Sequence, residues 1–377
     1  GIVSSHPIDF ESEVNGTEVK SCSLLQTQRA RTYQSDLNSR LWFHASSLEA
    51  KSLHKGCGSS VDYEDSKRKP SFVMLGTQKS GTTSIEEMLA EFGCVGLDAN
   101  GGQEVHFFDS GKFAHGRIPS ALLNDYLVRP WRKCDSRNLR FEKSPSYYMQ
   151  AWTPLRMCEG LGGEQRLVLF LRDPIARAYS GFYQSQNEPG KNPPVPLTPE
   201  GFDTYARVEI AIVQSCGGLP SGDLQRDLAG RSKFSACCRS VARKFSFHVW
   251  SSCECELDNH QHCGAFGKKS GSHVRMGIYA PYVRNWLQYF HPANIYMYIV
   301  EESVFIDMER VAWELSCDIS PVKPAICEGR EGSMRLGRGR KANSSTKKKP
   351  PMLGKTFEML KNFYSPFNHA LKSLLGR

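Results

Sequence analysis

The sequence predicts an α/β fold in which a parallel sheet is flanked by helices on both faces. Two observations predict it. Short, continuous apolar runs recur along the 377 residues, as in strands that are buried on both faces of a sheet. Segments whose apolar residues have helical spacing alternate with these runs, and this alternation favours parallel pairing. Hydrophobic residues make up 40% and charged residues 23% of the chain, which excludes wholesale disorder.

The first regular elements are predicted after residue 69. Residues 1–69 lack sustained periodicity, and we expect them to form a stem or N-terminal extension with some helix. Residues 71–75 are an apolar run that ends at Gly76, which is typical of a buried strand. One helical face then follows, formed by Ile85, Met88, Leu89 and Phe92.

Later segments repeat this pattern, and the longest apolar runs are far too short to span a bilayer. The expected elements are a strand at 166–171, a helix from Ile175 to Phe182, an amphipathic helix at 277–290 that belongs to the core, a strand at 295–300, and a helix at 357–375 that is interrupted at Pro366.

Two segments interrupt the predicted domain, which we place at residues 70–377. Residues 187–273 combine a Pro-rich loop at 187–199 with a Cys-, Ser- and Gly-rich part at 216–273, which predicts an irregular, cross-linked insertion. Residues 328–351 are predicted to form a basic loop.

Positive charge is concentrated in this basic loop. The chain carries 48 Lys and Arg against 39 Asp and Glu, and residues 330–349 hold eight of the basic residues with a single acid, Glu331. Such a block binds an anion or is a solvated loop. The anion could be a phosphate, a nucleic acid or an acidic polysaccharide.

The cysteine content favours the lumen of the secretory pathway. Thirteen cysteines are many for a cytosolic enzyme, and two glycosylation sequons begin at Asn15 and Asn343. The chain begins at Gly1 rather than Met, so we expect that an N-terminal segment is missing. If that segment carries an anchor, the protein is a type II membrane protein; a secreted protein is the alternative.

One cysteine cluster permits two interpretations. Cys253, Cys255, His260, His262 and Cys263 include every type of zinc ligand. Their spacing fits no common zinc module, so disulfides are favoured and no metal is expected.

Two motifs have the character of phosphate-binding segments. Residues 76–83 lie between a predicted strand and a helix, where backbone N–H groups, Lys79 and three hydroxyls form an anion cradle. The lysine precedes the second glycine, unlike in the NTPase P-loop. Arg172 stands at the end of a second strand with Ser180 two helical turns further on, and an arginine and a hydroxyl can hold one phosphate from two sides.

Two further motifs carry groups for proton transfer. In residues 103–109, an extended segment would point Glu104 and His106 the same way, and a carboxylate beside an imidazole can deprotonate an alcohol. A surface strand with incidental polar residues is the alternative for this segment alone. Residues 141–148 form a turn with Lys143, Ser and Pro, followed by two tyrosines.

These four motifs, in this order, resemble the carbohydrate sulfotransferases that use 3′-phosphoadenosine 5′-phosphosulfate (PAPS). The resemblance is closest to heparan sulfate glucosaminyl sulfotransferases and N-acetylgalactosamine 4-sulfate 6-O-sulfotransferase, and it runs from about Pro70 to Leu375. It implies a single P-loop-NTPase-like sulfotransferase domain in the Golgi lumen, a glycosaminoglycan acceptor and no required metal. It also implies that a disulfide between Cys317 and Cys327 precedes a basic lid.

The resemblance assigns a role to each motif. The donor would be held by Lys79, Ser80, Gly81, Thr82, Thr83, Arg172, Ser180 and, from the basic loop, Arg340 and Lys341. Glu104 would be the general base with His106 beside it, and Lys143 would lie near the acceptor and the sulfonyl group. Lys79 would neutralise charge on the bridging oxygen as the S–O bond breaks.

Two other functions compete with a carbohydrate O-sulfotransferase. A P-loop kinase-like phosphotransferase is disfavoured by the position of Lys79 and by the lack of a suitable Mg²⁺-holding aspartate after a later strand. A non-catalytic polyanion-binding protein would use residues 330–349 and would have no role for Glu104. Neither a nucleic acid nor a metal is an expected partner.

Overall fold

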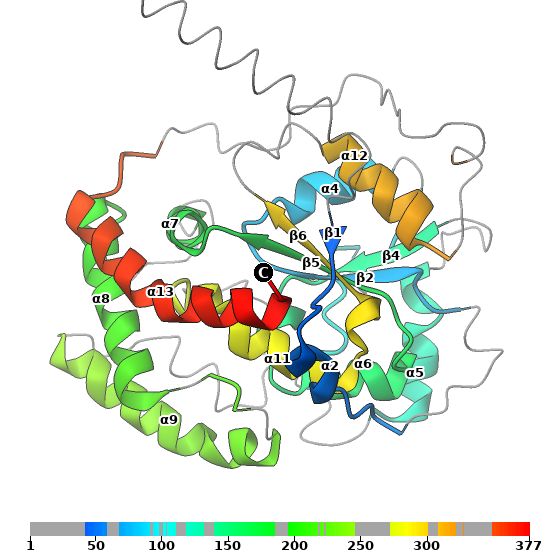
Figure 1. Ribbon diagram of the computed structural model, residues 1–377, viewed down its shortest axis with the longest axis horizontal. Helices are drawn as coiled ribbons and strands as arrows, with labels where there is room; N and C mark the ends of the chain where they lie inside the picture. Colours follow the sequence, from blue (N-terminus) through cyan, green and yellow to red (C-terminus); the bar gives the residue numbers. More distant parts are fainter. Residues whose placement is uncertain are drawn as a thin grey trace, which may run out of the picture. The chain divides into compact units, whose positions relative to one another are not determined.

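Figure 1 shows the computed structural model, which has a six-stranded sheet flanked by helices. The described residues are 42–58, 68–90, 93–97, 101–102, 104–110, 118–131, 139–184, 195–217, 219–221, 224–245, 272–300, 308–321, 327 and 349–377. The predicted α/β fold class is confirmed.

The sheet is parallel except at one edge. Its strand order is β1-β6-β5-β2-β4-β3, and only β1 pairs antiparallel, on β6. The strands are β1 (Trp42–Phe43), β2 (Phe72–Gly76), β3 (Gly93–Val95), β4 (Leu139–Lys143), β5 (Leu167–Arg172) and β6 (Ile295–Val300). The predicted strands at 71–75, 166–171 and 295–300 are thus confirmed as β2, β5 and β6.

The helices cover both faces of the sheet. Figure 1 shows α4 and α12 on one face, and α6 and α11 on the other. The helices are α2 (Leu48–Leu53), α4 (Thr82–Leu89), α5 (Ser120–Tyr126), α6 (Thr153–Leu161), α7 (Pro174–Gln184), α8 (Pro199–Cys216), α9 (Leu224–Lys244), α11 (Tyr279–Tyr289), α12 (Met308–Trp313) and α13 (Gly354–Leu375), with short turns at Arg129–Trp131, Tyr147–Met149, Arg275–Gly277, Pro292–Asn294 and Glu314–Ile319. Among the described residues, none of the helices is both long enough and apolar enough to cross a membrane.

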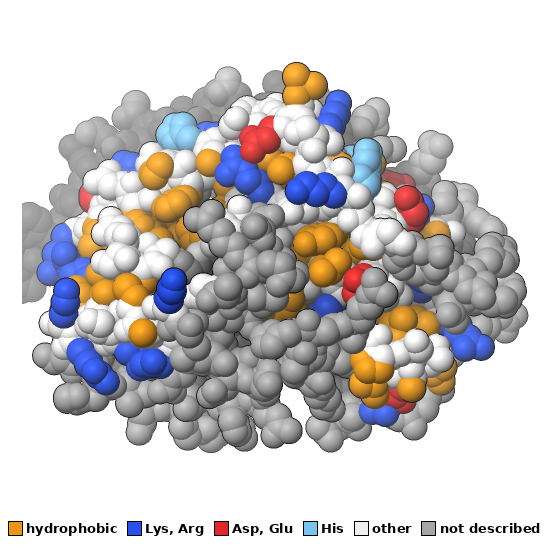
Figure 2. Space-filling model, turned by 90° about the horizontal axis from the view of Figure 1, so that it is seen from below, with side chains coloured by type: hydrophobic (Ala, Val, Ile, Leu, Met, Phe, Trp, Pro, Cys, Tyr) orange, Lys and Arg blue, Asp and Glu red, His pale blue; other side chains and the backbone are white. Residues whose placement is uncertain are grey.

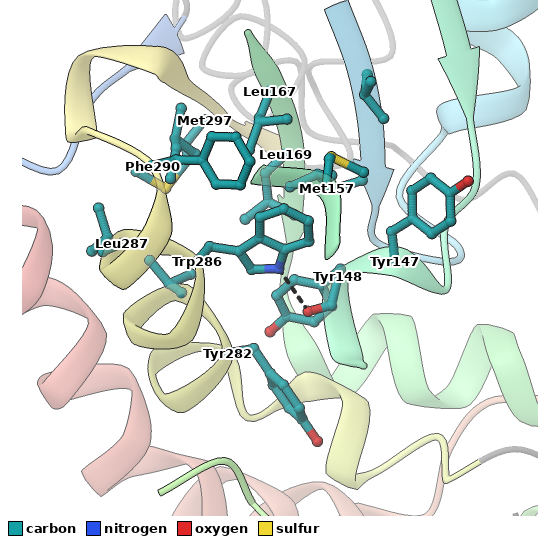
Figure 3. Packing of buried hydrophobic residues seen from close by; sticks show 14 of the residues in the cluster. Tyr147, Tyr148, Met157, Leu167, Leu169, Tyr282, Trp286, Leu287, Phe290 and Met297 are labelled. Carbon is teal, nitrogen blue, oxygen red and sulfur yellow. Dashed lines mark hydrogen bonds between the residues drawn. The ribbon is translucent and has the colours of Figure 1, made fainter. Parts of the chain in front are cut away.

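Helix α11 packs on one face of the sheet and contributes to the core there, as its aromatic residues predict. Trp286 is 1% exposed and packs toward Leu167 and Leu169 of β5 (Figure 3). Its indole Nε1 donates a hydrogen bond to the carbonyl of Tyr148, at 3.0 Å. The buried indole therefore has its polar group satisfied, and it ties α11 to the turn that follows β4.

A second core lies under α8 and α9, where the structure corrects the prediction. Residues 216–273 were expected to be irregular, but α9 occupies 224–244 of this segment as a helix. Phe234, Cys238 and Val241 lie at helical spacing and are buried, and the high Cys, Ser and Gly content hid this periodicity. The expected cross-linking is confirmed by the disulfide between Cys216 and Cys237.

Part of the predicted N-terminal extension belongs to this folded unit. Trp42 of β1 pairs with Tyr298 of β6, and α2 packs on α11. A disulfide joins Cys57 to Cys158 of α6. A two-residue edge strand has no measurable periodicity, so the sequence pattern could not place it.

Helix α13 does not break where a break was expected. It continues from Gly354 to Leu375 with Pro366 inside it. Pro366 is exposed, so its ring faces away from the core. On the other side Tyr364 is fully buried, and its hydroxyl donates to the carbonyl of Val274 at 2.6 Å. Packing of the apolar face therefore outweighs the local cost of the proline.

Candidate active site

The loop between β2 and α4 has the backbone shape of an anion cradle. Gly76 has φ +128°, and a Cβ there would lie 2.6 Å from the carbonyl oxygen of Pro145, so only glycine fits. Gly81, at φ +81°, precedes the first residue of α4. Gly81 has no side chain to cap this helix, so among the described residues the N–H groups of its first turn are left for an anion.

Hydroxyl groups stabilise the loop from within. Thr77 Oγ1 donates to the carbonyl of Phe170 at 3.0 Å and lies 2.6 Å from Ser80 Oγ. Because Thr77 has a single hydroxyl hydrogen, Ser80 is the donor of the second bond. The Ser80 hydroxyl, 1% exposed, is therefore engaged inside the loop. Of the predicted donor-binding hydroxyls, Thr83 is the exposed one.

Three cations converge beside this loop. Arg172, at the end of β5, donates from Nη1 to the carbonyl of Lys79 at 3.0 Å. Lys349 donates from Nζ to Ser180 Oγ of α7, also at 3.0 Å. Neither Lys79 nor Lys349 forms an ion pair with a carboxylate of the described residues. Arg172, Ser180 and the loop thus meet as predicted, because β2 and β5 are neighbours in the sheet.

Burial and the crowding of positive charge lower the pKa values of Lys79 and Lys349. Burial lowers the pKa of Lys79, and Arg172 lowers it further. Burial, Lys79 and Arg172 together lower the pKa of Lys349 to about 8. An anion bound among these groups would relieve their repulsion, so the cluster fits a phosphate group.

Glu104, His106 and Asp109 form a second cluster. His106 Nε2 lies 3.1 Å from Glu104 Oε2, and Nδ1 lies 3.0 Å from Asp109 Oδ2. Ser146 Oγ donates to the same Asp109 oxygen. Burial opposes the charge of His106, but the hydrogen bonds of Asp109 and Glu104 outweigh it and raise the pKa of His106 to about 10. With this pKa, His106 carries a proton on both ring nitrogens at neutral pH and donates to Glu104 and to Asp109.

The backbone of this segment differs from the expected extended strand. Residues 104–107 lie outside any helix or strand, and His106 has φ +50°. Hydrogen bonds from the turn after β4 hold the segment: the N–H of His106 donates to Ser144 Oγ at 3.0 Å, and that of Phe107 to the Tyr147 hydroxyl at 2.9 Å. Glu104 and His106 therefore come together because the backbone turns at His106, and not because an extended strand points both side chains the same way.

Lys143 connects the two clusters. Its Nζ lies 2.5 Å from Glu86 Oε2 and 3.8 Å from Glu104 Oε1. The same Nζ donates to Thr83 Oγ1 in the first turn of α4, at 3.3 Å. The predicted base is thus next to the predicted donor loop.

Three further residues contact the predicted site residues in ways that the sequence did not predict. Asp109 lies in the same motif as Glu104. It follows His106 by three residues, so a contact between the two side chains could have been predicted from their spacing. Glu86 gave no local signal, because its partner Lys143 is distant in the chain. Lys349 belongs to the predicted basic loop, but its contact with Ser180 was not assigned. Arg340, Lys341 and the cysteine cluster at 253–263 lie outside the described residues. Among the described residues, no group of His, Cys, Asp and Glu forms a candidate metal site.

Comparison with known families agrees with this geometry. Residues 69–308 match the family described as sulfotransferase domain. The chain belongs to the sulfotransferase family. This confirms the resemblance that was drawn from the four motifs.

Curated relatives of this sulfotransferase match it over different lengths. Heparan sulfate glucosamine 3-O-sulfotransferase 6 of Mus musculus is 24% identical over 82% of this chain and 73% of the relative. Heparan sulfate glucosamine 3-O-sulfotransferase 3A1 of the same species is 30% identical over 35% of this chain, and the match spans only 30% of that relative. Among solved structures, a sulfotransferase from Alicyclobacillus acidocaldarius is 16% identical, with a TM-score of 0.45 over 82% of this chain and 96% of that one.

Proposed function

We propose that this sulfotransferase transfers a sulfuryl group from PAPS to a hydroxyl of a glycosaminoglycan-type polysaccharide. The observation that carries the proposal is the convergence of Lys79, Arg172 and Lys349 at the carboxyl ends of β2 and β5. A donor with separate 3′- and 5′-phosphate groups supplies the negative charge that this cluster lacks.

The two phosphate groups of the donor would divide these contacts between them. The open N–H groups at Gly81–Thr83 and the Lys79 ammonium would take the 5′-phosphosulfate. Arg172, Ser180 and Lys349 would take the 3′-phosphate, where a guanidinium, a hydroxyl and an ammonium meet. Arg340 and Lys341 of the basic loop remain proposed donor contacts.

The transfer step needs a base and a cation on opposite sides of sulfur. Glu104 takes the proton of the acceptor hydroxyl as its oxygen bonds to sulfur. The bond between sulfur and the bridging phosphate oxygen breaks, and adenosine 3′,5′-bisphosphate leaves. Lys79 neutralises the charge that develops on that oxygen. His106 and Lys143, both within 4 Å of Glu104, keep its carboxylate oriented.

The names of the relatives support a heparan-type acceptor. Figure 2 shows one face of the molecule, on which Lys and Arg side chains stand in separate places among apolar ones. We place the acceptor hydroxyl at Glu104, whose side chain is 41% exposed.

The cysteines support a site of action in the secretory pathway. All cysteines of the described residues, eight in number, are disulfide-bonded, including the predicted pair Cys317 and Cys327. Such pairing persists in an oxidising compartment. We therefore propose the Golgi lumen, with residues 70–377 as the main part of the catalytic domain.

Thermal unfolding with added nucleotides tests the donor site. Adenosine 3′,5′-bisphosphate should raise the Tm as its concentration rises, because it binds only the folded protein. ATP has no 3′-phosphate and should raise the Tm far less. Equal shifts with the two nucleotides, or no shift with either, would contradict the donor assignment.

A further inference from the structure

A chain of alternating charges runs through the candidate site. Its order is Glu86, Lys143, Glu104, His106 and Asp109, and each neighbouring pair lies within 4 Å. Glu104 stands in the middle between two cations. It is also the member of the chain with the most exposed side chain, at 41%.

The two ends of this chain are buried carboxylates. Asp109 is 2% exposed and holds His106 on the side away from Glu104. Glu86 is 1% exposed and holds Lys143, which is 2% exposed, on the side away from Glu104. A buried ammonium needs a partner, and Lys143 takes the nearer carboxylate, at 2.5 Å from Glu86 against 3.8 Å from Glu104.

We propose that Glu86 is a positioning residue, which holds Lys143 back from Glu104 and so leaves Glu104 available as a base. The proposal rests on the proposed sulfuryl transfer, since it assigns a role relative to that base. Glu86 lies in α4, three residues beyond Thr83, so the helix that opens at the donor loop also sets the charge around the base.

The distances give the physical reason. If Glu86 lost its charge, Glu104 would be the one carboxylate among the described residues left to pair with the Lys143 ammonium. A small side-chain movement would then close the 3.8 Å gap. A direct ion pair favours the ionised form of Glu104 and weakens it as a proton acceptor. In the part of the chain that the structure describes, the charged groups that face Glu104 are His106 from its own segment, Lys143 from β4 and, through Lys143, Glu86 from α4.

The test is Glu86→Gln, which keeps the shape of the side chain and removes its charge. We expect kcat to fall about tenfold, less than the 10²–10⁴ that loss of the base itself would cost. The acid limb of the pH profile of kcat should move down by roughly one pH unit, because Lys143 then pairs with Glu104. The Tm shift with adenosine 3′,5′-bisphosphate should stay as in the wild type.

Glu87→Gln is the matched control, since the same change is made one residue along on the exposed side of α4. A Glu86→Gln enzyme with the kcat and pH profile of Glu87→Gln would overturn the proposal. A wild-type protein without sulfuryl transfer would instead overturn the proposed function.

A second pair of variants covers the case in which Glu86→Gln does not fold. In a Lys143→Met background there is no ammonium to hold, so adding Glu86→Gln should change neither kcat nor the pH profile. A further loss of kcat, or a further movement of the acid limb, in the double variant would show that Glu86 acts by another route and would also overturn the proposal.

Discussion

Glu104 has a neighbourhood that suits a base at neutral pH. Its carboxylate accepts from the His106 imidazolium, contacts Lys143 at 3.8 Å and keeps a side chain that is 41% exposed. The other acidic groups of the cluster, Asp109 and Glu86, are buried behind the two cations. Only Glu104 can therefore reach an acceptor hydroxyl from solvent.

Replacing Glu104 by glutamine should lower kcat by about 10²–10⁴, the usual contribution of a general base. The amide keeps the shape of the side chain but cannot take the proton. Binding of adenosine 3′,5′-bisphosphate, measured by the Tm shift, should barely change, because the proposed nucleotide contacts lie at Lys79 and Arg172. A variant that keeps more than roughly a third of the wild-type kcat would remove Glu104 from this role.

Lys349 should make nucleotide binding pH-dependent. Its pKa is lowered to about 8 in the free protein, whereas a bound phosphate favours the ammonium. Binding above pH 8 therefore requires uptake of a proton. The affinity for adenosine 3′,5′-bisphosphate should be flat below about pH 7 and fall as the pH rises through 8, as calorimetric titration would measure.

Lys349→Met should weaken that binding at pH 7 by about 10- to 100-fold, the loss of a charge-assisted hydrogen bond, and should flatten the pH dependence. Lys372→Met, at an exposed position of α13, is the control and should leave both unchanged. A pH dependence that persists in Lys349→Met would assign it to another group, such as Lys79.

The residue scale also shows what the sequence could reveal about the site. Lys79, Arg172 and Glu104 belong to motifs whose order and context predict their neighbours, and the structure brings the first two together. The partnership of Glu86 with Lys143 could not be predicted, since the two residues are 57 positions apart in the sequence and no local pattern links them.

At the scale of single elements, periodicity decided what could be predicted. Strands β2 and β5 are buried in the sheet, β6 is buried at four of its six positions, and all three gave continuous apolar runs. Helix α9 was missed, because its apolar spacing is sparse among Ser, Cys and basic residues. Strand β1 was missed because two residues at an edge carry no periodic signal.

Helix α13 allows a test of how packing overrides propensity. Pro366 cannot donate to the carbonyl of Asn362, and its ring is exposed. Pro366→Ala restores a donor in a helix that already continues through this position. It should raise the free energy of unfolding by roughly 1–3 kcal/mol, measured by urea denaturation.

Asn362→Ala is the matched control for this helix. It changes an exposed side chain one turn earlier without adding a backbone donor, so its effect should be within about 0.5 kcal/mol. A Pro366→Ala protein no more stable than Asn362→Ala would mean that the proline costs α13 nothing.

At the scale of the whole molecule, the disulfides indicate that the protein folds and functions in an oxidising compartment. Thirteen cysteines are present, and eight are bonded among the described residues. Cys94 and Cys238 are bonded outside the three pairs Cys57–Cys158, Cys216–Cys237 and Cys317–Cys327, so at least ten cysteines are engaged. Thiol titration of the unfolded, non-reduced protein should therefore find no more than three reactive groups. Ten or more reactive thiols would contradict both the pairing and the proposed luminal location.

The disulfides also join parts that are distant in sequence. The bond between Cys57 and Cys158 ties the segment before β2 to α6, and that between Cys216 and Cys237 ties α8 to α9. Reduction should lower the stability of the whole domain by several kcal/mol, because each bond restricts the unfolded chain.

Sulfuryl transfer itself tests the central claim most directly. The protein should be incubated with labelled PAPS and a panel of desulfated glycosaminoglycans, and the products should be analysed as disaccharides. We predict label in O-sulfated disaccharides without added ATP or Mg²⁺, and its loss in Glu104→Gln. A protein that binds adenosine 3′,5′-bisphosphate but transfers no label to any polysaccharide would contradict the proposed acceptor. A Glu104→Gln variant that labels the polysaccharides as well as the wild type would contradict the proposed site.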